Sequence, residues 1–236
     1  MNGNLNICER PVIVTSSMSR RSYNQYCAVT HALDRVGERW TLLIIRQLLS
    51  GPKRFKDLLD GLPGIGTNLL AARLKQLEAD EILQHGTLPP PAASAVYELT
   101  VRGRELEPVI HALARWGRPL LGRPRKGDKF QPSYVLVAMR SIFNPIAASG
   151  VRETYEYHVD GEVFHARVED GTVETSMGPG KDPAFVLTSD AQTFLLIGTG
   201  QLEPKGALAS GRIKIEGSRE AFRRSRDIFS GLGEEK

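Results

Sequence analysis

The chain has 236 residues, of which 41% are hydrophobic and 25% charged, as expected for two modest globular domains or one large one. Its longest purely aliphatic run near the N-terminus, residues 42–45, is far shorter than the ~20 residues of a membrane span, and the opening segment lacks the pattern of a signal peptide. Two cysteines, Cys8 and Cys27, do not make a disulfide framework, and the net charge is +4.

The charge is unevenly distributed along the chain. Residues 1–126 hold 18 Lys and Arg against 11 Asp and Glu, whereas residues 127–236 hold 13 against 16. A basic first half indicates an anionic partner for that half alone, although a difference of this size can also arise by chance. The scarcity of cysteine favours a reducing, cytoplasmic location.

Four segments are expected along the chain. Residues 1–22 are polar and without periodicity, which predicts a disordered lead in which Met18 is a possible alternative start. Gly, Pro and basic residues concentrate near residues 121–132, which predicts a linker. Residues 23–120 then form one domain and residues 133–236 a second.

The first domain is predicted to be mainly helical. Hydrophobic periodicity gives helices at 27–36, 40–49, 55–62 and 67–79, then two short strands and a helix from Thr100 to Trp116 with Pro108 as a local defect. The strands cover 82–87 and 95–99. A glycine turn precedes Thr67, whose hydroxyl can cap the fourth helix.

The second domain alternates strands and helices. Helices are predicted at 133–143, at 190–198 and from a Ser218 cap to Phe229, with strands at 154–159, 163–168, 172–177, 184–188 and 212–216. An Asp-Gly pair joins the first two strands as a hairpin. The expected fold class is therefore α+β: a winged helix-turn-helix domain followed by a domain with an antiparallel sheet.

The helix at 67–79 has the two-sided character of a DNA-recognition helix. Leu70, Leu74 and Leu77 form its core face, and the opposite side is small at its middle and polar at its ends. Small side chains allow the backbone to sit deep in the major groove, and amide or basic side chains can reach base edges and phosphates. An ordinary solvated helix face is the alternative. The residues expected to bind DNA are Lys53, Arg54, Lys56, Thr67, Asn68, Ala72, Arg73, Lys75 and Gln76.

Several motifs carry a resemblance to a known family. "LDRVGERWTLLIIRQLL", "GPKRFKDLL", "NLLAARLKQLE" and "YELTVRGREL" closely resemble the HxlR-type winged-helix transcriptional regulators over residues 26–116. The resemblance implies a homodimer, built from the first and last helices of the domain, that binds a pseudo-palindromic operator in double-stranded DNA. One departure is the wing: residues 84–99 contain no Lys or Arg, which leaves only His85 for phosphate contacts.

The second half resembles the SCP2-like (sterol carrier protein) domain. The resemblance rests on residues 185–229, with "GRIKIEG" as its clearest motif, and implies an apolar tunnel for hydrophobic molecules. We expect a small hydrophobic effector there, although a small domain needs the same residues for its core. The expected lining residues are Phe143, Phe164, Phe194, Leu195, Leu208 and Phe222, with Phe229 as a further possibility.

Cys27 carries the main alternative. Some HxlR-type relatives sense oxidants through the matching cysteine, and a thiol at a helix start can have a lowered pKa; a structural role in dimer packing is the competing interpretation. No nucleophile elbow, paired-carboxylate motif, phosphate loop or second metal-ligand pair is recognisable, so we expect no enzyme activity, cofactor or metal.

The sequence therefore predicts a cytoplasmic, dimeric DNA-binding regulator, by default a repressor, with a possible hydrophobic effector and no membrane association. Two alternatives remain open. One is a thiol-based redox regulator acting through Cys27. The other is a lipid-binding protein whose winged helix does not regulate transcription.

Overall fold

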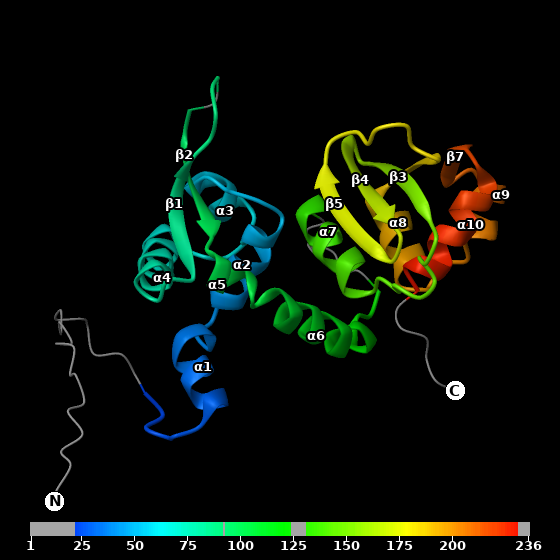
Figure 1. Ribbon diagram of the computed structural model, residues 1–236. Coiled ribbons are helices and arrows are strands. Elements are labelled where there is room, and N and C mark those ends of the chain that lie inside the picture. The colour runs from blue at the N-terminus through cyan, green and yellow to red at the C-terminus, as the bar shows by residue number, and fades with distance from the viewer. Residues whose placement is uncertain (1–21, 92, 124–130, 231–236) are drawn as a thin grey trace, which may run out of the picture. The chain divides into compact units, whose positions relative to one another are not determined.

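The computed structural model describes residues 22–91, 93–123 and 131–230 (Figure 1). Two compact units make up the chain, residues 1–38 and residues 39–236. The expected lead, apart from Ser22, lies outside the described residues, as do Cys8 and Met18. Residues 124–130 of the expected linker lie outside them as well.

In the first unit, the described residues form helix α1, Ala28–Val36. Asp34 ties the preceding segment to this helix, since its carboxylate accepts hydrogen bonds from the Ser22 hydroxyl (2.9 Å) and the Tyr23 backbone N–H (3.1 Å). The apolar stripe of α1 is open within this unit: Val29 is 67% exposed and Leu33 42%. A stripe of this kind needs a partner surface.

The second unit begins with the predicted helix-turn-helix and wing. Buried leucines and isoleucines from all of its elements form one core, and full burial of each such side chain contributes about 1.5–3 kcal/mol. The elements are α2 (Thr41–Leu49), α3 (Phe55–Asp60), α4 (Thr67–Ala79) and the antiparallel strands β1 (Leu83–Thr87) and β2 (Ala95–Leu99).

Glycines shape the turn between α3 and α4. Gly64 has φ +92°, a left-handed conformation that side chains rarely adopt. The expected cap at Thr67 is wrong: Gly66 is the N-cap, with extended backbone, and no side chain caps the helix. Thr67 is already the first helical residue, so its hydroxyl lies one position too far along to serve as the cap.

The helix expected from Thr100 to Trp116 is divided into two. Thr100 does act as a cap, because its hydroxyl accepts from the Gly103 N–H at 3.0 Å. Helix α5 ends after one turn, and Pro108 falls in the first turn of α6, where its missing N–H costs no hydrogen bond. The bounds are α5 (Val101–Arg104), α6 (Glu107–Gly117) and a 3-10 turn η1 (Arg118–Leu120).

A five-stranded sheet forms the framework of the C-terminal part (Figure 1). Its order is β5 (Thr172–Met177), β4 (Glu162–Glu169), β3 (Arg152–Val159), β6 (Phe185–Ser189), β7 (Ile213–Gly217). Three pairings are antiparallel, as expected, but β3 and β6 are parallel. The reason is the connection at 178–184, which takes the chain from the β5 edge back past β4 to pair on the far side of β3.

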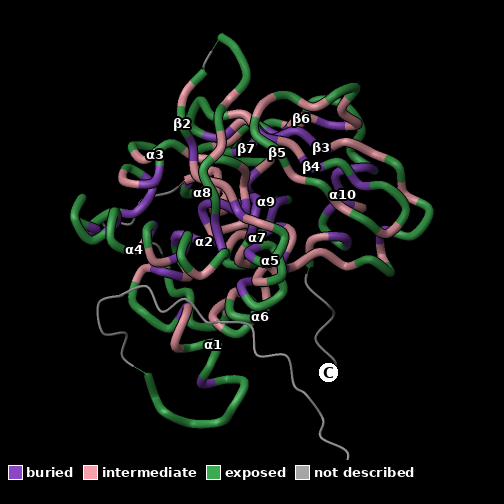
Figure 2. The backbone as a smooth tube through the Cα atoms, turned by 60° about the vertical axis from the view of Figure 1, so that its left-hand side comes forward, coloured by how far each residue is buried: buried purple, intermediate pink, exposed green. Residues whose placement is uncertain are grey.

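Four helices pack on one face of this sheet. They are α7 (Pro132–Ser141), α8 (Ala191–Gly198), α9 (Pro204–Ala209) and α10 (Arg219–Ile228), and α9 was not expected from the sequence. Every second strand residue points toward them, so that Tyr155, Tyr157, Phe164 and Phe185 are buried together. In Figure 2 the colour along the strands changes as more buried residues and more exposed residues follow one another.

Candidate functional site

The outer side of α4 is open, as a recognition helix requires. Leu70, Leu74 and Leu77 are at most 2% exposed, whereas Asn68, Ala72 and Lys75 are all exposed. Small and polar groups are therefore presented outward by a helix whose opposite face is fixed in the core. Within the described residues this surface is accessible. It can therefore enter the major groove of DNA, which is wide enough for a helix.

Two other residues expected to bind DNA are partly occupied inside the protein. Gln76 is half-buried, and its side-chain amide donates to the Asp80 carboxylate at 3.2 Å. Arg73 is half-buried as well. Partial burial sets both residues apart from Asn68 and Lys75, which are exposed.

The start of α3 presents basic side chains next to the wing. Arg54 and Lys56 are exposed, and the Arg54 N–H donates to the Asp57 carboxylate at 3.0 Å, which fixes the first turn. Lys53 is half-buried, and burial lowers its pKa despite the opposing effect of Asp57. The Lys53 backbone also exchanges hydrogen bonds with Tyr97 of β2 (3.0 and 2.8 Å).

The wing differs electrostatically from the helix face. His85 on β1 packs against the Tyr97 ring, with centroids 4.6 Å apart, and its Nε2 lies 3.5 Å from the Glu78 carboxylate. Gln84 donates to the Glu98 carboxylate at 2.8 Å. Acidic groups thus surround the strand section of the wing, which makes it a poor contact for phosphate.

A mostly apolar cavity of about 680 Å³ lies in the C-terminal part of the second unit. Three of the expected residues, Phe194, Leu195 and Phe222, are in its wall, and so is the further candidate Phe229. Phe143, Phe164 and Leu208 lie outside the wall. Phe164 is instead enclosed between the rings of Tyr157 and Phe194, at 5.3 and 5.7 Å between centroids, and Phe143 and Leu208 pack against the core.

The rest of the wall comes from residues that the sequence analysis did not select. Helix α6 supplies Ala114 and Gly117, and helix α7 supplies Val135, Ala138 and Met139. Nothing in the sequence marks these residues, since apolar residues of two helices become a cavity wall only through tertiary packing. A hydrophobic molecule of moderate size fits a space of this volume and lining.

The mainly apolar wall of this cavity also contains polar and charged residues, among them Arg118, Glu203, Arg226 and Asp227. Tyr157 and Ser225 line it too and are joined by a side-chain hydrogen bond, and burial raises the pKa of Tyr157 far above its usual range. The Arg118 guanidinium is held by the carbonyls of Ser230 (3.2 Å) and Gly198 (3.3 Å). A ligand would therefore meet a mainly apolar wall with several polar and charged side chains in it.

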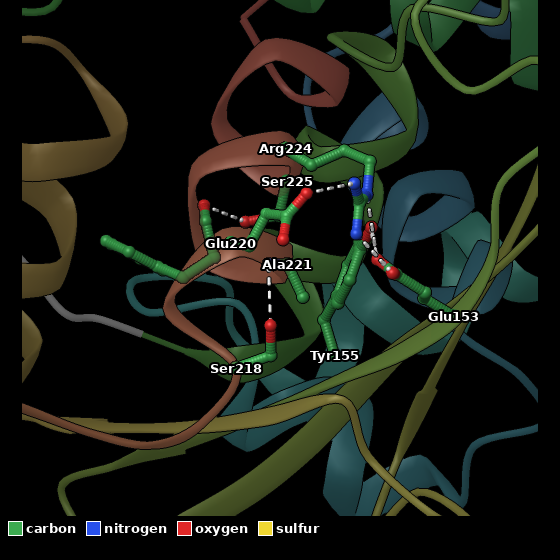
Figure 3. Close-up of polar contacts among 8 residues, drawn as sticks. Glu153, Tyr155, Ser218, Glu220, Ala221, Arg224 and Ser225 are labelled. Atoms are coloured by element: carbon green, nitrogen blue, oxygen red, sulfur yellow. Dashed lines mark hydrogen bonds and ion pairs between the residues drawn. The ribbon is translucent and has the colours of Figure 1, made fainter.

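Helix α10, which carries one side of the cavity wall, is fixed to strand β3 by a polar network (Figure 3). The Arg224 guanidinium donates to both oxygens of Glu153 (2.6 and 3.3 Å), and the Tyr155 hydroxyl donates to the same carboxylate at 2.7 Å. Burial raises the pKa of Glu153, but the hydrogen bonds from Arg224 and Tyr155 and the charge of Arg224 outweigh it and lower that pKa. Ser218 caps the helix by accepting from the Ala221 N–H at 3.1 Å.

Cys27 is a free and exposed thiol at the N-cap of α1. Hydrogen bonds from the Thr30 backbone N–H, from the Thr30 hydroxyl and from the Val29 N–H lower its pKa. A lowered pKa increases the thiolate fraction, which is the reactive form.

Comparison with known proteins identifies both parts of the chain. The HxlR-like helix-turn-helix model matches residues 35–124, and the SCP-2 sterol transfer family model matches residues 144–230. The HTH-type transcriptional regulator YodB of Bacillus subtilis (strain 168) is 40% identical over 36% of this chain and 76% of its own length. The chain belongs to the HxlR-like family of helix-turn-helix transcriptional regulators.

Other known proteins are similar to parts of this chain. The uncharacterized HTH-type transcriptional regulator sll1512 of Synechocystis sp. is 38% identical over 39% of this chain and 67% of its own length. The redox regulator HypR in its reduced form is 31% identical, with a TM-score of 0.36, over 39% of this chain and 90% of that chain. The sec-alkylsulfatase Pisa1 from Pseudomonas sp. is 12% identical, with a TM-score of 0.41; this chain spans 17% of it.

This HxlR-like chain therefore combines a DNA-binding helix-turn-helix with an SCP2 domain. None of the helices in the described residues has the length and apolar character needed to cross a membrane. In the same residues, no group of three or more His, Cys, Asp or Glu side chains is placed to hold a metal ion.

Proposed function

We propose that this HxlR-like regulator binds a pseudo-palindromic operator as a homodimer and acts as a repressor that responds to a small hydrophobic molecule. The exposed side of α4 is the observation that supports this most directly. Asn68 and Lys75 stand on a helix held by three buried leucines, so their positions are fixed relative to the protein core. In the proposal, Asn68 contacts base edges while Lys75, Arg54 and Lys56 contact phosphates, with Thr67, Ala72, Arg73 and Gln76 completing the surface.

Exposed apolar residues support the dimer. On α6, Val109, Leu113 and Trp116 recur at helical spacing and are 44%, 45% and 74% exposed. Helix α1 has its own open stripe, which includes Val29. Stripes of this kind on a water-facing helix are typical of subunit interfaces. Two recognition helices in such a dimer would lie about 34 Å apart, one turn of DNA.

The cavity supports the proposed response to an effector. Helix α6 contributes both to the exposed apolar stripe and, through Ala114 and Gly117, to the cavity wall. A ligand that prefers one position of α6 would therefore change the preferred dimer geometry and, with it, operator affinity. The ligand class that fits is mainly apolar, with polar atoms to meet groups such as Tyr157 and Ser225.

A mobility-shift assay tests the DNA-binding proposal. The full chain is mixed, at moderate salt, with the DNA upstream of its own gene and with a scrambled fragment of equal length and composition. We expect a complex with the upstream DNA that survives excess scrambled competitor. Equal affinity for both fragments would exclude sequence-specific regulation and favour a lipid-binding protein with a non-regulatory winged helix.

The cavity is tested with the fluorescent apolar probe 1-anilinonaphthalene-8-sulfonate. Ala138→Trp places a large ring in the cavity wall, whereas Ala209→Trp makes the same change at an exposed position on α9. Probe binding should weaken at least severalfold in Ala138→Trp and remain unchanged in Ala209→Trp. Equal probe binding by both variants would show that the probe binds outside the cavity.

Redox sensing through Cys27 is the second candidate function, favoured by the exposure and lowered pKa of this thiol. Cys27→Ser keeps the size of the side chain but removes the oxidisable sulfur. If Cys27 is the sensor, diamide should weaken DNA binding by the wild type and not by Cys27→Ser. An equal response of both proteins to diamide would exclude this role.

A further inference from the structure

The turn that precedes α4 is held from two sides. The Gly61 carbonyl, at the end of α3, accepts hydrogen bonds from the Gln47 side-chain amide and from the Tyr134 hydroxyl, each at 2.6 Å. Gln131 donates to the neighbouring Asp60 carbonyl at 3.1 Å. Gln47 belongs to α2, whereas Gln131, the N-cap of α7, and Tyr134 belong to the start of α7.

These contacts satisfy groups that a helix end leaves without partners. The last carbonyls of a helix have no N–H donor within the helix, so they must accept hydrogen bonds from groups elsewhere. Gln47 is 3% exposed, and its side-chain oxygen accepts from the Ser133 hydroxyl at 3.0 Å. No side chain fits at Gly61, because a Cβ there would lie 2.4 Å from the Gln47 amide nitrogen.

Helix α7 also contacts the other helices of the DNA-binding part. The Arg46 guanidinium lies 3.7 Å from the centre of the Tyr134 ring, which is a close cation–π contact. The Arg140 guanidinium donates to the Leu49 carbonyl at the end of α2 (3.1 Å) and pairs with Glu107 of α6 (3.3 Å). Three helices of the winged-helix part are therefore attached to one helix of the SCP2 part.

Other residues of α7, namely Val135, Ala138 and Met139, line the cavity. One helix therefore contacts both the ligand space and the turn that sets the start of α4. The two sets of contacts are rigidly related because they share ten residues of one helix, Pro132–Ser141.

We propose that α7 is a positioning element of the DNA-binding site, and that Tyr134 and Gln131 fix the turn from which the recognition helix begins. The expected effect of Tyr134 and Gln131 on DNA affinity rests on the proposed function of α4. Their expected effect on the position of the turn does not. A cavity occupant that displaces α7 would loosen or reset this turn. The SCP2 part would then regulate the recognition helix within one subunit, in addition to any change at the dimer interface.

Tyr134→Phe tests this proposal on the full chain. The variant removes the hydroxyl that donates to Gly61 and retains the ring under Arg46, so the fold should be preserved. Tyr23→Phe removes a hydroxyl from an exposed tyrosine and is the matched control. Loss of this partly buried hydrogen bond should speed hydrogen exchange in the peptide covering residues 58–70 by about threefold to tenfold, with strands β3 and β4 unchanged.

DNA affinity is the second readout, and it separates the two proposals. Tyr134→Phe should bind the upstream DNA about threefold to tenfold more weakly than Tyr23→Phe. Gln131→Ala should act on the same turn, so the double variant should lose less than the sum of the single losses. Wild-type exchange rates at residues 58–70 in both Tyr134→Phe and Gln131→Ala would overturn the positioning role. Faster exchange in a protein that shows no sequence preference for DNA would support positioning while contradicting the proposed function.

Discussion

Asn68 and Lys75 share the exposed side of α4 but offer different chemistry to DNA. An amide can donate to and accept from a single base edge, whereas an ammonium group attracts phosphate without regard to sequence. Both residues were identified from the helical wheel alone, because a 3.6-residue period is sufficient to decide which side of a helix the leucines occupy. The wheel could not show that Gln76 is held by Asp80, since that contact depends on side-chain conformation.

Substitution of these two residues should separate specificity from general affinity. Asn68→Ala should reduce the discrimination between operator and single-base variants by about 1–3 kcal/mol, because one base contact is lost. Lys75→Ala should weaken binding to all DNA sequences alike and reduce the salt dependence of binding by the equivalent of about one phosphate contact. Fluorescence anisotropy titrations against operator variants at several salt concentrations measure both effects. Unchanged discrimination in Asn68→Ala would remove its role in reading bases.

The Glu153 carboxylate predicts a pH dependence of stability. Its pKa is lowered in the folded protein, so its stabilising effect is present above the ordinary value of 4.5 and is lost as the pH falls through the folded value. Glu153→Gln should therefore lower the free energy of unfolding by about 1–2 kcal/mol near pH 7, a figure reduced for partial exposure. The difference in the free energy of unfolding between Glu153→Gln and the wild type should shrink below pH 4. Urea unfolding at pH 7 and pH 3.5 measures it, and a difference that grows in acid would contradict this assignment.

Among the elements, those with strong local signals were predicted well. The fourth helix was expected at 67–79 and is Thr67–Ala79, and the strand at 172–177 has the expected bounds. Asp-Gly turns and alternating residues fix such strands locally. The parallel pairing of β3 with β6 and the short helix α9 were missed, because a crossover and a six-residue helix are set by long-range packing.

Two glycines in helices predict opposite effects on stability. A Cβ at Gly103 would lie 2.0 Å from the Ile82 carbonyl oxygen, so Gly103→Ala should force α5 away from the wing and cost about 3 kcal/mol or more. A Cβ at Gly206 in α9 would meet nothing within 4 Å, so Gly206→Ala should stabilise the protein by about 0.5–1 kcal/mol. Urea midpoints of the two variants measure both effects. Equal midpoints would show that α5 is not closely packed.

At the scale of the whole molecule, sequence predicted the two parts but not their connection. The HxlR-like and SCP2 resemblances were recognisable because each has its own local motifs. The cavity wall from α6 and the hydrogen bonds from Gln131 and Tyr134 to the α3–α4 turn were not, since they join residues more than 70 positions apart. Regulation in this chain is therefore proposed from contacts that only the folded structure shows.

In the proposed complex α4 enters a DNA groove with its exposed side, and one pair of variants tests this directly. Ala72→Glu places a carboxylate at the small centre of that side, and Ala209→Glu makes the same change on exposed α9, so the two have equal net charge. In anisotropy titrations with the upstream DNA, Ala72→Glu should bind at least about a hundredfold more weakly than Ala209→Glu, because a buried like charge costs several kcal/mol. Equal affinities of the two variants would contradict the central claim.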